Sequence, residues 1–214
     1  SVSEILASQK LNIQEILYKG GWPELYAHTG RDSKKFLDDY INSYIEKDIV
    51  LAAGIQKSRE FLKFVKLLAG RIGELLDFNS LGNDADVDSK TAKDWISILE
   101  RMHIIALTPP YSSNLSKRLI KSPKVYFIDT GLACRLQGWT SSAPILTSPQ
   151  QGHLFENLVF AELFKLVNGC PVFEMVGPNV VKVHQLIGLQ HFNNCTVFVG
   201  AVFLGSDQYI PGVL

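Results

Sequence analysis

Basic side chains, together with one threonine, gather in two short stretches that could bind phosphate. One stretch lies on a predicted helix, and the other fills a predicted loop between two strands. Lysine and arginine contacts to phosphate supply most of the affinity of proteins for nucleic acid. The candidates are Lys90, Thr91, Lys93 and Arg101 on the helix and Lys117, Arg118, Lys121 and Lys124 on the loop.

Acidic residues stand close to these cations in the sequence. Asp94 and Glu100 share the predicted helix, and Asp84, Asp86 and Asp88 precede it. Charged runs of both signs are typical of a solvated face, and protein partners accept such a face more readily than DNA does. The pattern therefore favours contact with a protein over contact with DNA through the same surface.

Other kinds of catalysis lack their motifs in this chain. Binding the phosphates of ATP through a P-loop needs Gly-x-x-x-x-Gly-Lys-Ser/Thr, and no such run is present, so the chain alone is predicted not to hydrolyse ATP. There is no Gly-x-Ser-x-Gly turn, and the histidines form no metal-binding motif, with His184 and His191 seven residues apart, so no metal site is predicted. Asp129-Thr130-Gly131 predicts a strand end and a tight turn, with Asp129 capping the following N–H groups and Gly131 at positive φ.

Composition indicates an ordinary globular chain of one or two domains. The 214 residues are 46% hydrophobic and 20% charged, and the net charge is zero, so any phosphate site must be a local patch. Three scattered cysteines predict buried thiols and a reduced, cytoplasmic setting. No apolar run approaches the ~20 residues of a membrane span, so no membrane partner is expected. A chain that begins at Ser1 is expected to be a fragment.

The elements that must position these residues begin with two predicted helices. Residues 34–49 place Leu37, Ile41, Tyr44, Ile45 and Asp48 on one face at helical spacing, with Ser33 as the N-cap. Residues 59–69 repeat the pattern, and Gly70 is expected to end that helix.

A winged-helix unit is predicted next. It consists of a short helix at residues 73–81, a turn at 82–84, and a third helix that Asp88 or Ser89 caps and that runs to about residue 103. A stripe of Trp95, Leu99 and Met102 should face the core. Two strands, 104–107 and 125–128, are then expected to pair around a long loop, as in a winged helix.

The remaining third predicts a small α/β half. A helix begins at residue 152 and ends near 167, and short apolar runs follow it. Residues 197–204 are continuous, β-branched and aromatic, which predicts one buried strand.

Several motifs in order resemble one family, the C-terminal DUF4143 region of bacterial and archaeal AAA-type ATPases. The strongest lies in residues 107–136, where a Pro-Pro-Tyr turn and a polar loop lead through a strand to Asp129-Thr130-Gly131-Leu132. The others are Gly20-Gly21-Trp22-Pro23-Glu24 and residues 44–49, 94–105 and 152–163. The resemblance covers about residues 1–169.

The resemblance implies an ATPase module upstream, acting in cis, which would bring the ATP and magnesium that this chain lacks. It also implies a restriction-endonuclease-like fold after residue 145, with Glu156 and Glu162 at the positions of helix-borne metal-binding acids. The acid-x-Lys triplet of such nucleases is missing from the sequence.

The sequence thus predicts an α+β chain: a helical bundle with a winged helix at residues 1–144, then an incomplete nuclease-like α/β domain at 145–214. The expected function is a non-catalytic recognition region of an AAA-type ATPase that binds a protein partner or DNA through the winged-helix surface. The alternative is a metal-dependent nuclease whose acid-x-Lys motif is absent from this sequence. The short connection after the 152–167 helix further predicts a break in the chain between Glu174 and Val181.

Overall fold

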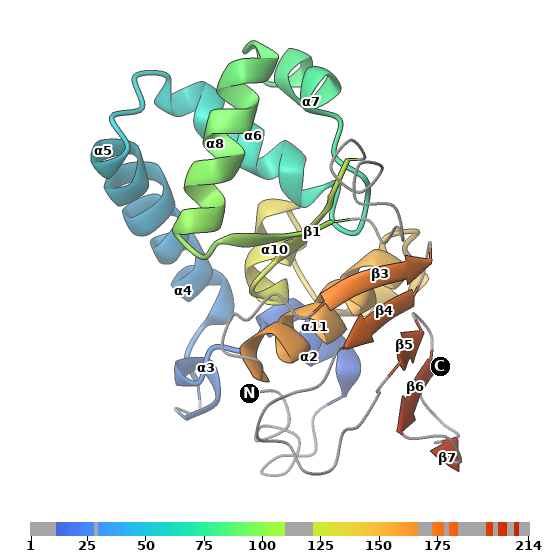
Figure 1. The fold of residues 1–214 in the computed structure, drawn as a ribbon. Coiled ribbons are helices and arrows are strands. Elements are labelled where there is room, and N and C mark those ends of the chain that lie inside the picture. The colour runs from blue at the N-terminus through green and yellow to red at the C-terminus, as the bar shows by residue number, and fades with distance from the viewer. Residues whose placement is uncertain are drawn as a thin grey trace.

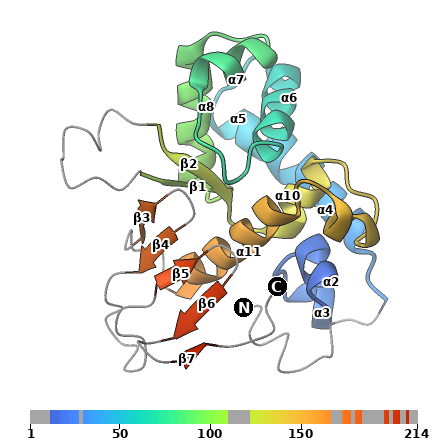
Figure 2. The same cartoon turned by 90° about the vertical axis from the view of Figure 1, so that its right-hand side faces the viewer.

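A computed structural model describes residues 12–27, 30–109 and 122–166, and beyond residue 172 the backbone of five short strands (Figure 1). The described part before residue 167 is mostly helical and contains one two-stranded antiparallel hairpin. Helices α6–α8 lie at one end, α2 lies at the other, and α10 and α11 lie between them (Figure 2). None of the described helices is both long and apolar enough to cross a membrane.

The first predicted helix is present but is not a uniform α-helix. After α2 (Ile13–Lys19) and α3 (Glu24–Ala27), helix α4 (Ser33–Tyr40) continues as a π-helix, η1 (Ile41–Ile49), and ends in α5 (Val50–Ala52). In an α-helix of ~3.6 residues per turn, side chains that recur every four residues move progressively round the helix. A π-helix has more residues per turn, so such side chains stay on one face. This keeps Ile41, Ile45 and Ile49 buried together.

Two details of that prediction are wrong. The N-cap is Asp32, whose carboxylate accepts from the N–H groups of Lys34 and Lys35, and Ser33 is the first helical residue. A carboxylate is the stronger acceptor for these N–H groups because its charge also complements the helix dipole. Asp48, predicted on the buried face, is exposed.

Helices α6 (Ser58–Ala69) and α8 (Ser89–Arg101) agree with the predicted segments. Helix α6 ends before Gly70, and Asp88 caps α8 by accepting from the N–H of Thr91 at 2.8 Å. Trp95 is 5% exposed and meets Phe61 and Phe64 edge-to-face, with ring centroids 5.3 and 5.2 Å apart. The predicted core stripe of α8 is therefore confirmed at Trp95 and Leu99, while Met102 is half-buried.

The short helix between α6 and α8 begins later than the predicted range of residues 73–81. Helix α7 spans Phe78–Asp84, where a turn was predicted at its end, because Asp77 accepts from the N–H groups of Asn79 and Ser80 and starts the helix there. Residue 82 lies inside α7. It is a glycine for steric reasons, because a Cβ there would come within 2.8 Å of the Val87 carbonyl oxygen.

The predicted strand pairing is confirmed. Strand β1 (Ile105–Thr108) pairs antiparallel with β2 (Lys124–Phe127), with Ile105 opposite Phe127 and Thr108 opposite Lys124. Each strand is shifted by one residue from its predicted start. Residues 110–121 of the connecting loop lie outside the described residues.

The other edge of β2 carries backbone bonds from the segment that was predicted to be helical. Gly73 donates to the Val125 carbonyl at 2.9 Å, Leu76 donates to the Pro123 carbonyl at 2.9 Å, and Leu75 forms a bridge with Lys124. These bonds hold residues 73–76 along the edge of β2, with a turn at Gly73 and a bridge at Leu75, instead of in a helix. A sequence pattern read locally does not reveal a partner strand fifty residues away.

Helix α10 (Thr130–Leu136) follows β2, and then a 3-10 turn, η2 (Ala143–Thr147), leads to α11 (Gln151–Leu166). The helix predicted from residue 152 is thus confirmed. Side chains of α11 bond to β2 across the predicted domain boundary between residues 144 and 145, and the division into two domains itself stays a prediction.

The last strands form one antiparallel sheet in the order β3-β4-β5-β6-β7. Their bounds are β3 (Phe173–Gly177), β4 (Val180–Val183), β5 (Thr196–Phe198), β6 (Ala201–Leu204) and β7 (Gln208–Tyr209). The single strand predicted at residues 197–204 is wrong, because Phe198 pairs with Ala201 and the run folds back as two strands.

The predicted break between Glu174 and Val181 stays a prediction. Strands β3 and β4 pair with Glu174 opposite Lys182, and residues 178–179 between them lie outside the described residues. Helices, one hairpin and this sheet do not by themselves identify a winged helix or an endonuclease-like fold.

Candidate functional site

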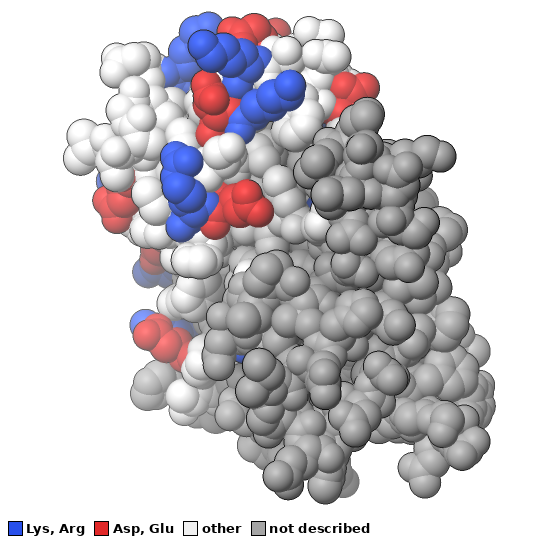
Figure 3. All heavy atoms as spheres, in the orientation of Figure 1, with Lys and Arg blue, Asp and Glu red and all other residues white. Residues whose placement is uncertain are grey.

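The exposed face of α8 carries charges of both signs. Lys90, Lys93 and Arg101 are exposed, and so are Asp94 and Glu100 between them. Basic and acidic side chains alternate over this end of the molecule in the space-filling view (Figure 3). Thr91 serves the helix cap instead, because both its N–H and its Oγ1 donate to the Asp88 carboxylate, at 2.8 and 3.1 Å.

The loop cations divide into two groups. Lys117, Arg118 and Lys121 lie outside the described residues. Lys124 is placed differently from the prediction, because it is buried and points from β2 toward α11 rather than into solvent. The alternation of side chains along a strand explains this, because Lys124 and Tyr126 lie on the face of β2 that meets α11.

Lys124 meets Glu156, so the structure brings together two residues that the sequence assigned to different functions. Lys124 Nζ lies 2.9 Å from Glu156 Oε1, and both side chains are at most 10% exposed. The hydroxyl of Tyr126 donates to the same carboxylate oxygen. Burial, and then the charge of Glu156, raise the pKa of Tyr126 far above its ordinary value, so the phenol stays protonated as a donor.

The surroundings of this buried ion pair are closely packed. Phe160 stacks on Tyr126 with ring centroids 4.2 Å apart. A Cβ at Gly73 would come within 3.2 Å of Glu156 Oε2 and 3.0 Å of His153 Nδ1, so these side chains rest on the glycine backbone. Glu156 is therefore held in a buried, closely packed site.

Asn157 performs a role that sequence reasoning missed. Its side-chain oxygen accepts from the Phe127 N–H at 2.7 Å, and its amide donates to the Phe127 carbonyl at 3.0 Å. One side chain thus completes both backbone groups of a buried strand residue, as a neighbouring strand would. No spacing in the sequence signals this bond, because it joins residues 30 positions apart.

Asp129 is the centre of a second buried cluster. Its carboxylate accepts from the N–H groups of Gly21 at 2.7 Å and Leu132 at 2.9 Å. Burial raises the pKa of the Asp129 carboxyl, while these two donors and the Lys165 charge act in the opposite direction. The predicted capping role of Asp129 is confirmed, and its second partner, Gly21, explains why a Gly-Gly turn stands at residues 20–21.

Glycines allow this cluster to close. Gly20 has φ +77°, and a Cβ there would lie 2.1 Å from Asp129 Oδ1. The prediction for Gly131 is wrong: it lies in α10 rather than at positive φ. It is needed for a close approach, because a Cβ on Gly131 would lie 2.4 Å from the Lys19 carbonyl.

Gly131→Ala is expected to lower the free energy of unfolding by about 2–3 kcal/mol, since neither backbone can yield without moving α2 away from α10. Urea unfolding would measure the loss. Gly152→Ala is the matched control, because a Cβ there meets nothing within 4 Å, and it should stabilise α11 by about 0.5–1 kcal/mol. Equal stability of the two variants would contradict the close approach.

Glu162 belongs to this second cluster and not to the first. It lies 3.0 Å from Lys165 Nζ, near Gly21. The two acids that the family resemblance assigned to one metal therefore bind different lysines. Among the described residues there is no group of three or more His, Cys, Asp or Glu side chains that could hold a metal ion.

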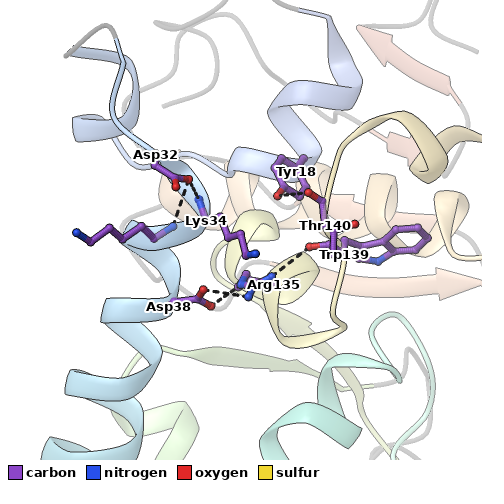
Figure 4. A network of polar contacts seen from close by, with 8 residues as sticks. Tyr18, Asp32, Lys34, Asp38, Arg135, Trp139 and Thr140 are labelled. Carbon is purple, nitrogen blue, oxygen red and sulfur yellow. Dashed lines mark hydrogen bonds and ion pairs between the residues drawn. The ribbon is translucent and has the colours of Figure 1, made fainter.

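A third polar network ties α4 to α10 (Figure 4). The guanidinium of Arg135 bonds both carboxylate oxygens of Asp38, and it also donates to the Trp139 carbonyl at 3.4 Å. Tyr18 donates to the neighbouring Thr140 carbonyl at 3.0 Å. These bonds fix the segment that follows α10. Cys134 is buried in the same helix, where burial raises the pKa of its thiol, as expected for an inert cysteine.

That fixed segment forms one wall of an open groove of about 1080 Å³. The outer face of α6 provides the largest part of its lining, and Glu46 on η1 also contributes. Basic side chains outnumber the single acid, and half-buried apolar groups lie beside them. The lining includes Arg59, Lys63, Lys66, Arg71, Leu62 and Trp139. Sequence reasoning missed this groove, although the spacing of Arg59, Lys63 and Lys66 on a predicted helix was a visible signal.

Comparison with curated proteins finds relatives of unknown activity. The chain is 28% identical over 156 residues to the uncharacterized protein Rv2008c of Mycobacterium tuberculosis, and equally to the uncharacterized protein Mb2031c of Mycobacterium bovis. The match covers 72% of this chain and 35% of either relative, so the chain spans about a third of the length of the curated relatives it matches. No solved structure matches the chain.

Comparison with family models corrects the resemblance to the DUF4143 region of AAA-type ATPases. An upstream ATPase module and a nuclease-like half were implied by that resemblance alone and lose its support. The motifs that suggested it, Gly20-Gly21 and Asp129-Thr130-Gly131, are the residues that pack against one another around a buried carboxylate. Residues 10–143 match the model described as a domain of unknown function, DUF8612, and the chain therefore belongs to that family.

Proposed function

We propose that this chain is a recognition module that binds a protein partner through the exposed face of α8 and the adjoining hairpin. Helices α6, α7 and α8 followed by β1 and β2 have the element order of a winged helix. In this arrangement α8 is the helix that a partner contacts.

The rigid support of α8 favours such a role. Asp88 caps its first turn, and Trp95 and Leu99 anchor its inner face in the core. Its outer side chains are therefore presented at fixed positions. Binding surfaces on rigid elements lose less conformational entropy when they meet a partner.

The mixed charge of the outer face is the observation that carries the proposal. Lys93 and Asp94 are adjacent, as are Glu100 and Arg101, and all four are exposed. DNA would repel the acids, whereas a protein surface can pair with both signs. Lys124 is also withdrawn from the surface by Glu156, which removes one of the expected phosphate contacts.

A nuclease receives less support from the described residues. Glu156, its first acid, is enclosed by a lysine and a tyrosine, and Glu162 is bonded to another lysine. A metal-binding carboxylate must instead be open to the ion and to water.

Site-specific photo-crosslinking tests the proposal. A benzophenone amino acid at Ser97 or Lys93 should yield a discrete protein adduct in the native cells, and the same label at Lys35 on α4 should not. Charge reversal with Lys90→Glu and Arg101→Glu should remove the adduct. Adducts that disappear on nuclease treatment would identify nucleic acid as the partner, and equal adducts from Lys35 would contradict a role for α8.

A further inference from the structure

The groove over α6 has a regular arrangement of cations. Arg59, Lys63 and Lys66 recur at intervals of four and three residues, so they line one stripe of the helix over about 10 Å. Arg71 continues the stripe just beyond the helix end, and Glu46 on η1 is the acid that shares the lining. The lining thus holds four cations and one acid, in a chain whose net charge is zero.

Two of these cations are already bonded to aspartates, and two have no ion pair within the described residues. Lys63 lies 2.6 Å from Asp86, with both side chains about half exposed or more, and Arg71 bonds Asp84 and Ser80. The exposed pair of Lys63 with Asp86 is weak, so a partner could replace it. Arg59 and Lys66 are exposed and form no ion pair with any described residue.

Apolar groups lie on both sides of the cationic stripe. Leu62 and Leu67 are half-buried on α6, and Trp139 faces them across the groove. Trp139 is held in place, because its indole N–H donates to Gln137 at 2.6 Å and its carbonyl accepts from Arg135.

The groove continues toward an exposed leucine. A neighbouring hollow of about 420 Å³ shares Glu46 and Ser58 with the groove and is lined by Leu51, Val50 and Ile55. Leu51 is 84% exposed, the most open large apolar side chain among the described residues. An exposed leucine beside exposed cations suits a ligand that presents both apolar and acidic groups.

We propose that this groove binds an acidic amphipathic segment of a partner protein. Carboxylates of the segment pair with Arg59 and Lys66, and its apolar side chains pack on Leu51, Leu62 and Trp139. Complementary charge selects the partner, and burial of its apolar face holds it. Nucleic acid could use the cations and Trp139 but would leave Leu51 and Leu62 without contacts, since bases stack on aromatic side chains and not on leucines.

This proposal is independent of the proposed function of α8, because it concerns the outer face of another helix. Failure of crosslinking at Ser97 leaves it intact, and failure of the experiment below leaves the α8 proposal intact.

Fluorescence anisotropy of the purified chain provides the test. The probe is a fluorescein-labelled Glu/Leu peptide of about 18 residues with leucines at i, i+3, i+4 and i+7. A scrambled peptide of the same composition should bind about tenfold more weakly. Arg59→Glu with Lys66→Glu should weaken binding of the probe by about tenfold or more. Leu51→Ser, which removes only an exposed side chain, should weaken it about threefold.

The matched control is Lys34→Glu with Lys35→Glu, which changes the net charge equally on the exposed side of α4 and should leave the affinity unchanged. Circular dichroism melts confirm that each variant is folded. Equal weakening by the control pair, equal binding of the scrambled peptide, or absence of binding overturns the proposal. Tighter binding of duplex DNA than of the peptide, with the same sensitivity to the α6 pair, would assign the groove to nucleic acid instead.

Discussion

Glu156→Ala is expected to lower the free energy of unfolding by about 3–5 kcal/mol, because it leaves the buried charge of Lys124 without its carboxylate. Lys124 is 8% exposed, so its ammonium group has little contact with water in the folded chain. The variant also removes the acceptor of the Tyr126 hydroxyl. Urea unfolding followed by circular dichroism would measure the loss.

A double variant separates the ion pair from simple packing. Lys124→Met with Glu156→Leu replaces both charges by apolar groups of similar size and should recover most of the lost stability, because no buried charge then remains. Glu100→Ala is the control for loss of a helical glutamate, and it should change stability by no more than about 0.5 kcal/mol since Glu100 is exposed. A single variant as stable as this control would show that the pair contributes nothing.

Trp95→Ala should cost about 3–5 kcal/mol as a large-to-small change in the core. Trp95 stands between Phe61 and Phe64, and both edge-to-face contacts would be lost together with its buried area. Because these rings join α8 to α6, the loss should appear in the main unfolding transition of the chain. Urea melts followed by far-ultraviolet circular dichroism would report it.

Ser97→Ala on the same helix is the control for Trp95. Ser97 is exposed and donates to the Lys93 carbonyl at 3.0 Å, so its removal should change stability by less than about 0.5 kcal/mol. A loss under about 1 kcal/mol for Trp95→Ala would mean that the ring adds little to the core.

Local signals allowed the sequence to predict much of the framework. Helices α6 and α8 follow apolar spacing that needs no knowledge of distant residues, and Asp88 and Asp129 cap helices with their own neighbours. Strand pairing in the hairpin followed from two short apolar runs and was confirmed with boundaries one residue away.

Long-range contacts account for what the sequence did not reveal. Residues 73–76 are not helical because β2 supplies their backbone partners, and the helix begins later, after its N-cap Asp77. Lys124 looked like a loop cation until Glu156 on α11 was seen opposite it. Neither partner can be identified from spacing, since the separations are about fifty and about thirty residues.

The family resemblance failed for a related reason. Gly20, Gly21 and Asp129 belong to the motifs that resembled the ATPase family. In the structure, the two glycines pack around the Asp129 carboxylate. A short loop that must admit a buried acid needs glycine for steric reasons, whatever the activity of the protein. Such motifs indicate a shared way of closing a fold more reliably than a shared function.

The bonds along β2 determine how a further strand could join this protein. Residues 73–76 occupy the β2 edge that faces away from β1, and the amide of Asn157 occupies the backbone of Phe127. An extended peptide that adds to a sheet needs a row of free backbone groups, and this edge of β2 offers none at Val125 or Phe127. A partner's strand, or a second copy in an aggregate, therefore cannot extend the hairpin along this part of β2.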